Sequence, residues 1–185
     1  PGPILEDETF QLFAFPVTHR GPGCLGYGCV EKARRPFLAE EAERLGVPVG
    51  PERKRLVAGE PVTLADGRTI YPDQVLGPPT SGARLIYVGD AGRTEDLVEV
   101  ARGADALVIE ATYLEEEREV ARDYGHLTAA QAAALAREAG VRQLFLTHIS
   151  RRYSARQVLG EAAPIFPNTI VPDDLDRFRI VKGEG

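Results

Sequence analysis

The chain has 185 residues, 43% of them hydrophobic, and a formal net charge of −6 at pH 7. This length suits one domain with room for an appendage, and the hydrophobic fraction is enough for a real core. The negative charge argues against a protein that coats nucleic acid nonspecifically, although a local basic patch is still compatible with it. No apolar run approaches the roughly 18 residues of a membrane helix, and the start, PGPILEDE, lacks the features of a signal peptide. We therefore expect a cytoplasmic protein with no membrane segment.

The first third of the sequence contains one apolar run and one segment rich in turn residues. Residues 10–18 are mostly apolar and predict a buried strand. Residues 19–29 contain four glycines, which permit close backbone approach or positive φ, and we expect a loop there. Cys24 and Cys29 fall in this segment, and we expect two free thiols because nothing else in the sequence suggests secretion.

Residues 30–80 differ in character from the rest of the chain. A short amphipathic helix is expected from about Pro36 to Leu45, and VTLADGRTI predicts a small hairpin that turns at Asp66-Gly67. The segment has few large apolar residues, so we expect little core within it and partial packing against the main domain. Loops of this length in compact domains are usually functional, although an ordinary surface loop is the alternative.

From residue 84 onward, strand-like and helix-like patterns alternate, which predicts an α/β sheet with helices packed on it. Thr128 followed by Gln131 is a capping box that marks one helix start. The expected elements are strands 84–88, 105–109, 142–146 and 177–181, and helices that begin at Thr94, near 114–122, at 129–139 and near Ser154.

Five potential metal ligands or proton carriers lie at the ends of these patterns. They are His19, Asp90, Glu110, His126 and His148, and the chain has no other histidine. The carboxyl ends of strands are where active sites of open α/β sheets are built. Two imidazoles and a carboxylate at strand ends, His19, His148 and Asp90, suit zinc or manganese. Taken singly, a strand-end Asp often only caps a turn, and a structural histidine is the more usual interpretation of either His.

Glu110 and His126 form a second kind of pair. His126 precedes a helix start, where the helix dipole disfavours the imidazolium, and a carboxylate partner opposes that effect and fixes the tautomer. A histidine tuned in this way can transfer a proton near neutral pH. A surface Glu and a helix-capping His are the alternative interpretation.

Three motifs carry a resemblance to a known family. They are EATY at 110–113, GHLTAAQAA from Gly125 and LTHISRRY from Leu146, with His19 and Gly89-Asp90 in matching order. The sequence resembles the ribonuclease Z family, tRNA 3′-processing endonucleases of the metallo-β-lactamase superfamily. The resemblance implies the C-terminal half of a metallo-β-lactamase-like αββα sandwich, formed by residues 1–29 and 81–185. Residues 30–80 are similar to the family's inserted, protruding arm, which binds tRNA.

The resemblance also implies roles for the site residues. His19 and His148 would ligate different zinc ions bridged by Asp90, with manganese as a possible substitute, and Glu110 with His126 would deliver protons. The activity implied is two-metal hydrolysis that removes the 3′ trailer of precursor tRNA and leaves a 3′-hydroxyl. A homodimer is implied as well.

The sequence departs from the family pattern in several places. Ala91, Ile109 and Leu127 stand where Thr, His and Ser are usual, and none of these changes removes a ligand. The HxHxDH motif is absent from the chain, which contains no Met and begins at Pro1. We therefore expect a fragment, a processed form or an incomplete sequence. With two protein ligands each, its metals should bind weakly, and we expect these 185 residues alone to cleave no pre-tRNA.

Two basic clusters are candidates for contact with the substrate. Arg53, Lys54 and Arg55 suit phosphates, and Arg151, Arg152 and Tyr153 could position the scissile phosphate or stack a base. Solvated charges and a packed Tyr are the alternative. A dinuclear hydrolase of a small phosphodiester or ester, and a non-catalytic RNA-binding or dimer-partner subunit, are the competing functions. The long insert disfavours the first, and the retained site residues disfavour the second.

Overall fold

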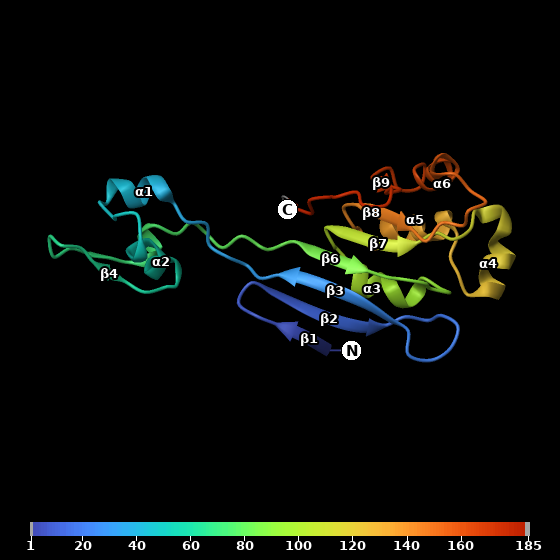
Figure 1. Cartoon of the computed structure of the whole chain (residues 1–185), viewed down its shortest axis with the longest axis horizontal. Coiled ribbons are helices and arrows are strands. Elements are labelled where there is room, and N and C mark those ends of the chain that lie inside the picture. The colour runs from blue at the N-terminus through green and yellow to red at the C-terminus, as the bar shows by residue number, and fades with distance from the viewer. Residues whose placement is uncertain (1, 184–185) are drawn as a thin grey trace. The chain divides into compact units, whose positions relative to one another are not determined.

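A computed structural model describes residues 2–183 and divides the chain into two compact units (Figure 1). We call Pro1–Lys32 with Gly82–Gly185 the core unit, and Ala33–Ser81 the inserted unit. The chain passes into the inserted unit after one strand, Leu25–Glu31, and returns just before another, Arg84–Tyr87. These two strands pair with each other. Within the described residues, no helix is long and apolar enough to cross a membrane.

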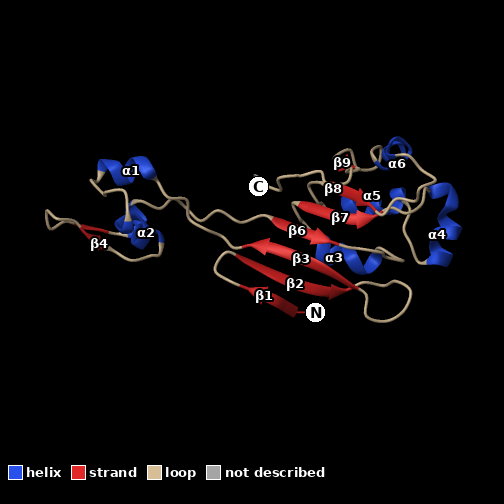
Figure 2. Ribbon diagram, viewed as in Figure 1, coloured by secondary structure: helices blue, strands red, loops and turns tan. Residues whose placement is uncertain are grey.

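The core unit is built on one seven-stranded mixed sheet with the order β1-β2-β3-β6-β7-β8-β9 (Figure 2). Neighbours from β1 to β6 pair antiparallel, and neighbours from β6 to β9 pair parallel. The strands are β1 (Gly2–Glu6), β2 (Phe10–Pro16), β3 (Leu25–Glu31), β6 (Arg84–Tyr87), β7 (Ala106–Glu110), β8 (Leu144–Thr147) and β9 (Thr169–Ile170).

Helices connect the parallel strands. The order of strands and the right-handed rule for such crossovers place these helices on the same face of the sheet. The helical elements are η2 (Glu95–Leu97), α3 (Val98–Ala101), η3 (Glu115–Glu117), α4 (Arg118–Tyr124), α5 (Ala129–Glu138) and α6 (Ala155–Ala162). The predicted capping box is present at α5, where Gln131 N–H donates to Thr128 Oγ1 and Thr128 N–H donates to Gln131 Oε1.

The two faces of the sheet differ in burial because side chains alternate along a strand. Ile86 and Val88 are fully buried in the main core with the apolar stripe of α5. Tyr27 and Tyr87, a cross-strand pair of β3 and β6, are 40% and 48% exposed on the opposite face. The helix-covered face therefore holds the core, and the core unit consists of one sheet with one layer of helices.

The glycine-rich segment was predicted as a loop, and this is wrong for its second half, which forms β3. Gly26 and Gly28 lie under aromatic rings of β2: a Cβ at Gly28 would lie 2.1 Å from the Phe13 ring. These glycines serve close packing, whereas Gly21 and Gly23 adopt positive φ in the preceding turn. Cys24 and Cys29 are free thiols, as expected.

The strand expected at 177–181 is also wrong, because β9 at Thr169–Ile170 takes the place next to β8. Phe178 instead packs its ring on Phe145, with the centroids 4.9 Å apart. The apolar residues of this segment therefore cover part of the sheet rather than extend its edge.

The inserted unit has a small core of its own, contrary to the expectation of little core. Six buried residues form this core: Ala42, Val47, Leu56, Val62, Ile70 and Val75. Its elements are α1 (Ala39–Arg44), α2 (Pro51–Val57), the hairpin β4 (Val62–Thr63) and β5 (Thr69–Ile70), and η1 (Pro72–Gln74). The two helices and the two strands of the hairpin each contribute one residue to this core. The sequence analysis did not predict α2, whose first helical position is Pro51.

Candidate active site

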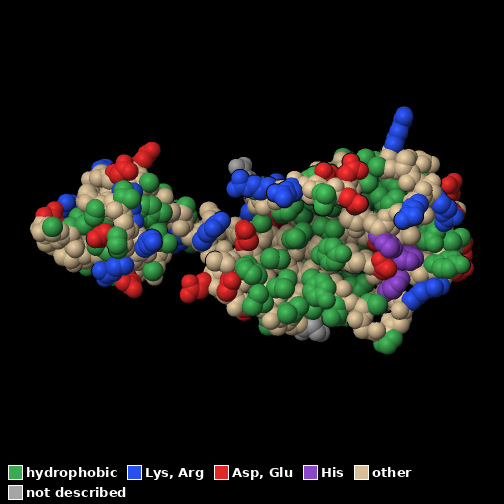
Figure 3. Space-filling view, viewed as in Figure 1, with side chains coloured by type: hydrophobic (Ala, Val, Ile, Leu, Met, Phe, Trp, Pro, Cys, Tyr) green, Lys and Arg blue, Asp and Glu red, His purple; other side chains and the backbone are tan. Residues whose placement is uncertain are grey.

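The topology brings four strand ends to one edge of the sheet. Asp90 follows β6, Glu110 ends β7 and His148 follows β8, and these three strands are parallel. β2 pairs antiparallel with β3, which pairs antiparallel with β6, so β2 runs in the same direction as β6. His19, just beyond β2, therefore reaches the same edge. Figure 3 shows the histidine side chains gathered at one place on the surface of the core unit.

Asp90 lies between two imidazoles and offers a different oxygen to each. His19 Nε2 is 3.8 Å from Asp90 Oδ2, and His148 Nε2 is 3.4 Å from Asp90 Oδ1. The Asp90 and His148 side chains are 39% and 54% exposed, so the site is open to solvent. A carboxylate flanked in this way could hold a divalent cation together with either imidazole.

The tautomer of His19 follows from its partner. Its Nδ1 is 2.7 Å from the Gly125 carbonyl oxygen, which can only accept, so in the neutral ring Nδ1 carries the proton and Nε2 has the lone pair. Gly125 adopts a φ of +71° at the end of α4, and a Cβ there would lie 3.4 Å from His19 Nδ1. An imidazole that donates from one nitrogen to a carbonyl and presents the other is the usual form of a metal-ligating histidine.

Glu110 is fully buried and its carboxylate holds the second part of the site together. Oε1 accepts from the Ala91 backbone N–H at 2.8 Å and from His126 Nδ1 at 2.8 Å. Oε2 accepts from the Thr112 hydroxyl at 2.5 Å. The buried carboxylate thus fixes the His126 ring, whose Nε2 is left free to donate or accept a proton.

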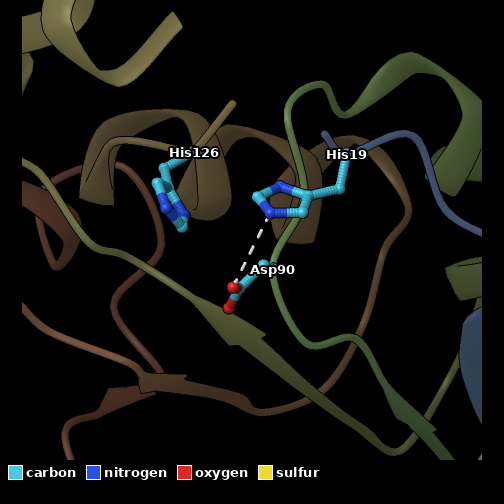
Figure 4. A group of neighbouring side chains, drawn as sticks. All are labelled: His19, Asp90 and His126. Atoms are coloured by element: carbon cyan, nitrogen blue, oxygen red, sulfur yellow. Dashed lines mark ion pairs between the residues drawn. The ribbon is translucent and has the colours of Figure 1, made fainter. Parts of the chain in front are cut away.

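The three imidazoles are close enough to act together. The His126 ring centroid is 5.1 Å from that of His19 and 5.5 Å from that of His148. Among the described residues, the group whose potential ligand atoms all lie within 4.8 Å of one another is His19, Asp90 and His126 (Figure 4). The predicted ligand set contains His148 in place of His126, and the geometry leaves both within reach of Asp90.

The donor set fits borderline divalent cations. Imidazole nitrogen and carboxylate oxygen are standard zinc ligands, and manganese accepts them as well. His126 has its Nδ1 engaged by a carboxylate, which suits a proton carrier, whereas His148 has no side-chain partner other than Asp90 among residues 2–183. With His126 set aside, two cations bridged by Asp90 would each have two ligands in this part of the chain, fewer than the usual three.

The predicted phosphate-binding residues of the inserted unit have unequal environments. Arg53 is largely buried and donates to the Val47 carbonyl at 3.0 Å, and Arg55 pairs with Glu60 at 3.0 Å. Lys54 is exposed and forms no ion pair with any residue that the structure describes. Lys54 is therefore the member of this cluster that is free to meet a phosphate.

The second predicted cluster follows β8. Arg152 pairs with Glu117 at 2.9 Å and lies over the rings of Tyr113 and Tyr153. The Tyr113 ring is in turn 6.1 Å from that of His126, so this aromatic and guanidinium group borders the site. Arg151 is exposed, whereas the Tyr153 hydroxyl is buried without a hydrogen-bond partner among the described residues. These contacts favour a packed Tyr153 over a base-stacking one.

Sequence reasoning missed three contributors to the site. Thr112 lies in the EATY motif and Gly125 in the GHLT motif, so both were in view without an assigned role. The Ala91 backbone N–H could not be found from residue type, because its role depends only on where the chain turns after Asp90.

The sequence of the chain is similar to proteins of a known superfamily. A family model described as a β-lactamase superfamily domain matches residues 55–149, slightly more than half of the chain. A ribonuclease Z from Bradyrhizobium sp. (strain ORS 278) is 49% identical over 180 residues, covering 97% of the chain and 60% of that protein. A ribonuclease Z from Archaeoglobus fulgidus is 43% identical over 187 residues, covering 99% and 60%. The chain thus spans about 60% of the length of these curated relatives.

Solved structures share the fold. Human tRNase Z, short form, superposes with a TM-score of 0.57 at 21% identity, over 96% of this chain and 46% of that one. The metallo-β-lactamase fold protein YhfI from Bacillus subtilis gives a TM-score of 0.54 at 16% identity, over 91% and 48%. The predicted fold class is therefore confirmed. The chain belongs to the β-lactamase superfamily, has the metallo-β-lactamase fold, and is similar in sequence to ribonuclease Z proteins over nearly its whole length.

Proposed function

We propose that the protein is a metal-dependent endoribonuclease that removes the 3′ trailer from precursor tRNA and leaves a 3′-hydroxyl. The observation that carries the proposal is the meeting of His19, Asp90 and His148 with the buried Glu110–His126 pair at one sheet edge. The similarity to proteins named ribonuclease Z supplies the substrate class. Two zinc ions are the proposed cofactors, with manganese as a possible substitute.

The residues divide the chemistry between them. His19 Nε2, His148 Nε2 and both oxygens of Asp90 would hold the cations, which when bound supply Lewis-acid activation of water and phosphate. His126 has Nδ1 held by Glu110, and it would deliver a proton from Nε2 to the leaving oxygen. Glu110 would keep the ring oriented and fix which ring nitrogen faces the substrate.

We also propose an RNA partner, an oligomeric state and a cellular location for the protein. The inserted unit would bind the body of the tRNA, and the whole protein would work as a cytoplasmic homodimer. Arg151 and Arg152 would lie along the RNA next to the site. The described residues supply only two ligands for each cation, so these 185 residues alone are expected to bind zinc weakly and to cleave no pre-tRNA.

The test uses the full-length gene product with zinc, a pre-tRNA carrying a 3′ trailer, and a small chromogenic phosphodiester. Cleavage at the trailer junction with a 3′-hydroxyl product is expected, and Glu110→Gln should lower kcat by roughly 10²–10⁴-fold, the range of general acid–base catalysis. Gln keeps the shape of Glu110 but removes its charge. Turnover of the small substrate without pre-tRNA cleavage would favour a small-molecule hydrolase. No turnover of either would favour an RNA-binding subunit.

A further inference from the structure

His148 has an unusual backbone conformation. Its φ is +53°, and among the described residues only one other non-glycine residue, Leu175, has a positive φ. This left-handed region is disfavoured for residues with a Cβ, and it persists where the surrounding structure holds it. His148 is therefore a position at which neighbouring contacts must stabilise the chain.

Thr112 makes those contacts from both sides of the turn. Its hydroxyl lies 3.0 Å from the His148 carbonyl oxygen, and its own carbonyl oxygen accepts from the Ser150 N–H at 3.2 Å. Thr112 is 9% exposed, so these bonds are shielded from water. We call this pair of bonds the Thr112 clamp.

The same hydroxyl reaches the other half of the site. It lies 2.5 Å from Glu110 Oε2, and the Thr112 N–H is 3.3 Å from that oxygen. A hydroxyl has one proton, so it donates to either Glu110 or His148 at a given moment, and Glu110 Oε2 retains the backbone donor in both cases. Thr112 thus joins the turn at His148 to the carboxylate that orients His126.

The backbone decides where the His148 imidazole points. Its side chain is 54% exposed, so packing restrains the ring little, yet Nε2 lies 3.4 Å from Asp90 Oδ1. A change of φ from the left-handed to the usual region would redirect the Cα–Cβ bond and carry the ring away from Asp90.

We propose that Thr112 is a positioning residue that holds His148 in its left-handed conformation and so aims the imidazole at Asp90. The role in metal binding rests on the proposed function, because it requires His148 to be a ligand, whereas the clamp itself does not. Valine fills the space of threonine without the hydroxyl, and serine keeps the hydroxyl without the methyl group. Thr112→Val and Thr112→Ser are therefore a matched pair.

The first measurement is amide hydrogen exchange in the metal-free full-length protein. Thr112→Val should exchange faster than the unsubstituted protein at Ser150 and its neighbours, by about tenfold, while the strands of the core keep their protection. Thr112→Ser should stay close to the unsubstituted protein. Equal exchange at Ser150 in all three proteins would overturn the clamp.

The second measurement is zinc affinity by competition with a chromophoric chelator, alongside the thermal midpoint. Thr112→Val should weaken zinc binding by about 10–100-fold, the usual effect of removing a group that orients a ligand. Thr112→Ser should restore it. Unchanged affinity in Thr112→Val, or an equal loss in both variants, would contradict the positioning role. If the unsubstituted protein binds no zinc, the proposed function fails, and the exchange measurement still decides whether the clamp exists.

Discussion

Two of the imidazoles in this site give one ring nitrogen to the protein and keep the other free. His19 donates from Nδ1 to a backbone carbonyl, and His126 donates from Nδ1 to a buried carboxylate. The different partners suit different tasks. A backbone carbonyl holds the His19 ring with Nε2 turned toward Asp90, where a cation could bind, whereas the Glu110 carboxylate orients the His126 ring for proton transfer.

Gly125 gives a direct test of this arrangement at the scale of one residue. Gly125→Ala should cost about 1–2 kcal/mol for its left-handed backbone. The new Cβ would lie 3.1 Å from Arg20 Cγ, so the chain at Arg20 must shift, and we expect this shift to disturb the neighbouring His19 and its bond to the Gly125 carbonyl. Zinc affinity and pre-tRNA cleavage in the full-length protein should both fall.

Gly140→Ala is the matched control for this change. Gly140 has a φ of +63°, but a Cβ there meets nothing within 4 Å. Both variants should lose similar thermal stability, and only Gly125→Ala should lose zinc affinity. Similar zinc affinity in the two variants would refute the role assigned to Gly125.

At the scale of an element, the segment between β2 and β3 is tied to η2 next to the site. Asp96 accepts a hydrogen bond from the Thr18 hydroxyl at 2.9 Å and pairs with Arg93. The Thr18 hydroxyl, followed by the Arg93 guanidinium, holds the pKa of Asp96 below its ordinary value of 3.8. Because the pKa is lower in the folded state, this stabilisation is complete above about pH 4 and is lost as the pH falls through the folded-state value.

NMR titration of the Asp96 carboxyl measures how strongly the Thr18 hydroxyl and Arg93 stabilise its ionised form. The pKa should lie below 3.8 in the unsubstituted protein, and it should rise in Thr18→Val, which removes the larger contribution. Arg93→Gln should raise it as well. A pKa that Thr18→Val leaves unchanged would show that the hydroxyl does not hold the carboxylate.

Two neighbouring basic residues of α2 are expected to differ in role: Lys54 in pre-tRNA binding and Arg53 in the stability of the inserted unit. Lys54→Ala should weaken pre-tRNA binding and reduce the slope of log K against log salt by about 1, with no change in thermal stability, because Lys54 is exposed and unpaired among residues 2–183. Arg53→Ala should instead cost roughly 1–3 kcal/mol, because the Val47 carbonyl loses its donor.

Binding of pre-tRNA at several salt concentrations, together with thermal unfolding, distinguishes the two variants. Arg55→Ala is a useful third variant because Arg55 is paired with Glu60 on the surface. Loss of stability in Lys54→Ala, or an unchanged salt slope, would contradict the assignment of Lys54 to phosphate contact. Hydrolysis of a small phosphodiester should be unaffected.

At the scale of the whole molecule, the chain has two hydrophobic cores that share no residue. The inserted unit joins the core unit where β3 and β6 pair, and Glu31 N–H donates to the Ala83 carbonyl at 2.9 Å. Residues 33–81 therefore leave and re-enter the core unit at neighbouring points. A short turn such as Asn-Gly can close such a gap between antiparallel strands.

Replacing residues 33–81 with such a turn in the full-length protein should leave a folded protein with a similar thermal midpoint. Hydrolysis of a small phosphodiester should persist, because the site residues all lie in the core unit. Pre-tRNA affinity should fall strongly if the inserted unit binds the tRNA. Retained affinity would refute that assignment, and a protein that does not fold would refute the independence of the two cores.

The sequence by itself determined the alternation of strands and helices after residue 84, the capping box at Thr128 and the five groups at strand and helix ends. These are local signals: side-chain periodicity, a four-residue hydrogen-bonding pattern and the residue types that bind metals or carry protons. It also indicated the superfamily, because the motifs around Glu110, His126 and His148 together resemble those of ribonuclease Z, and the superfamily is confirmed by the family model.

Only the tertiary structure decided how these groups are arranged. Glycines that predicted a loop lie in β3 because aromatic rings of β2 cover them, which is a contact between strands and not a property of glycine. The segment 177–181 is not a strand because β9 already pairs with β8. Likewise, the sequence contains Thr112 and Gly125 but not their roles, since a hydroxyl or carbonyl acquires a role from the partner that folding brings within about 3 Å.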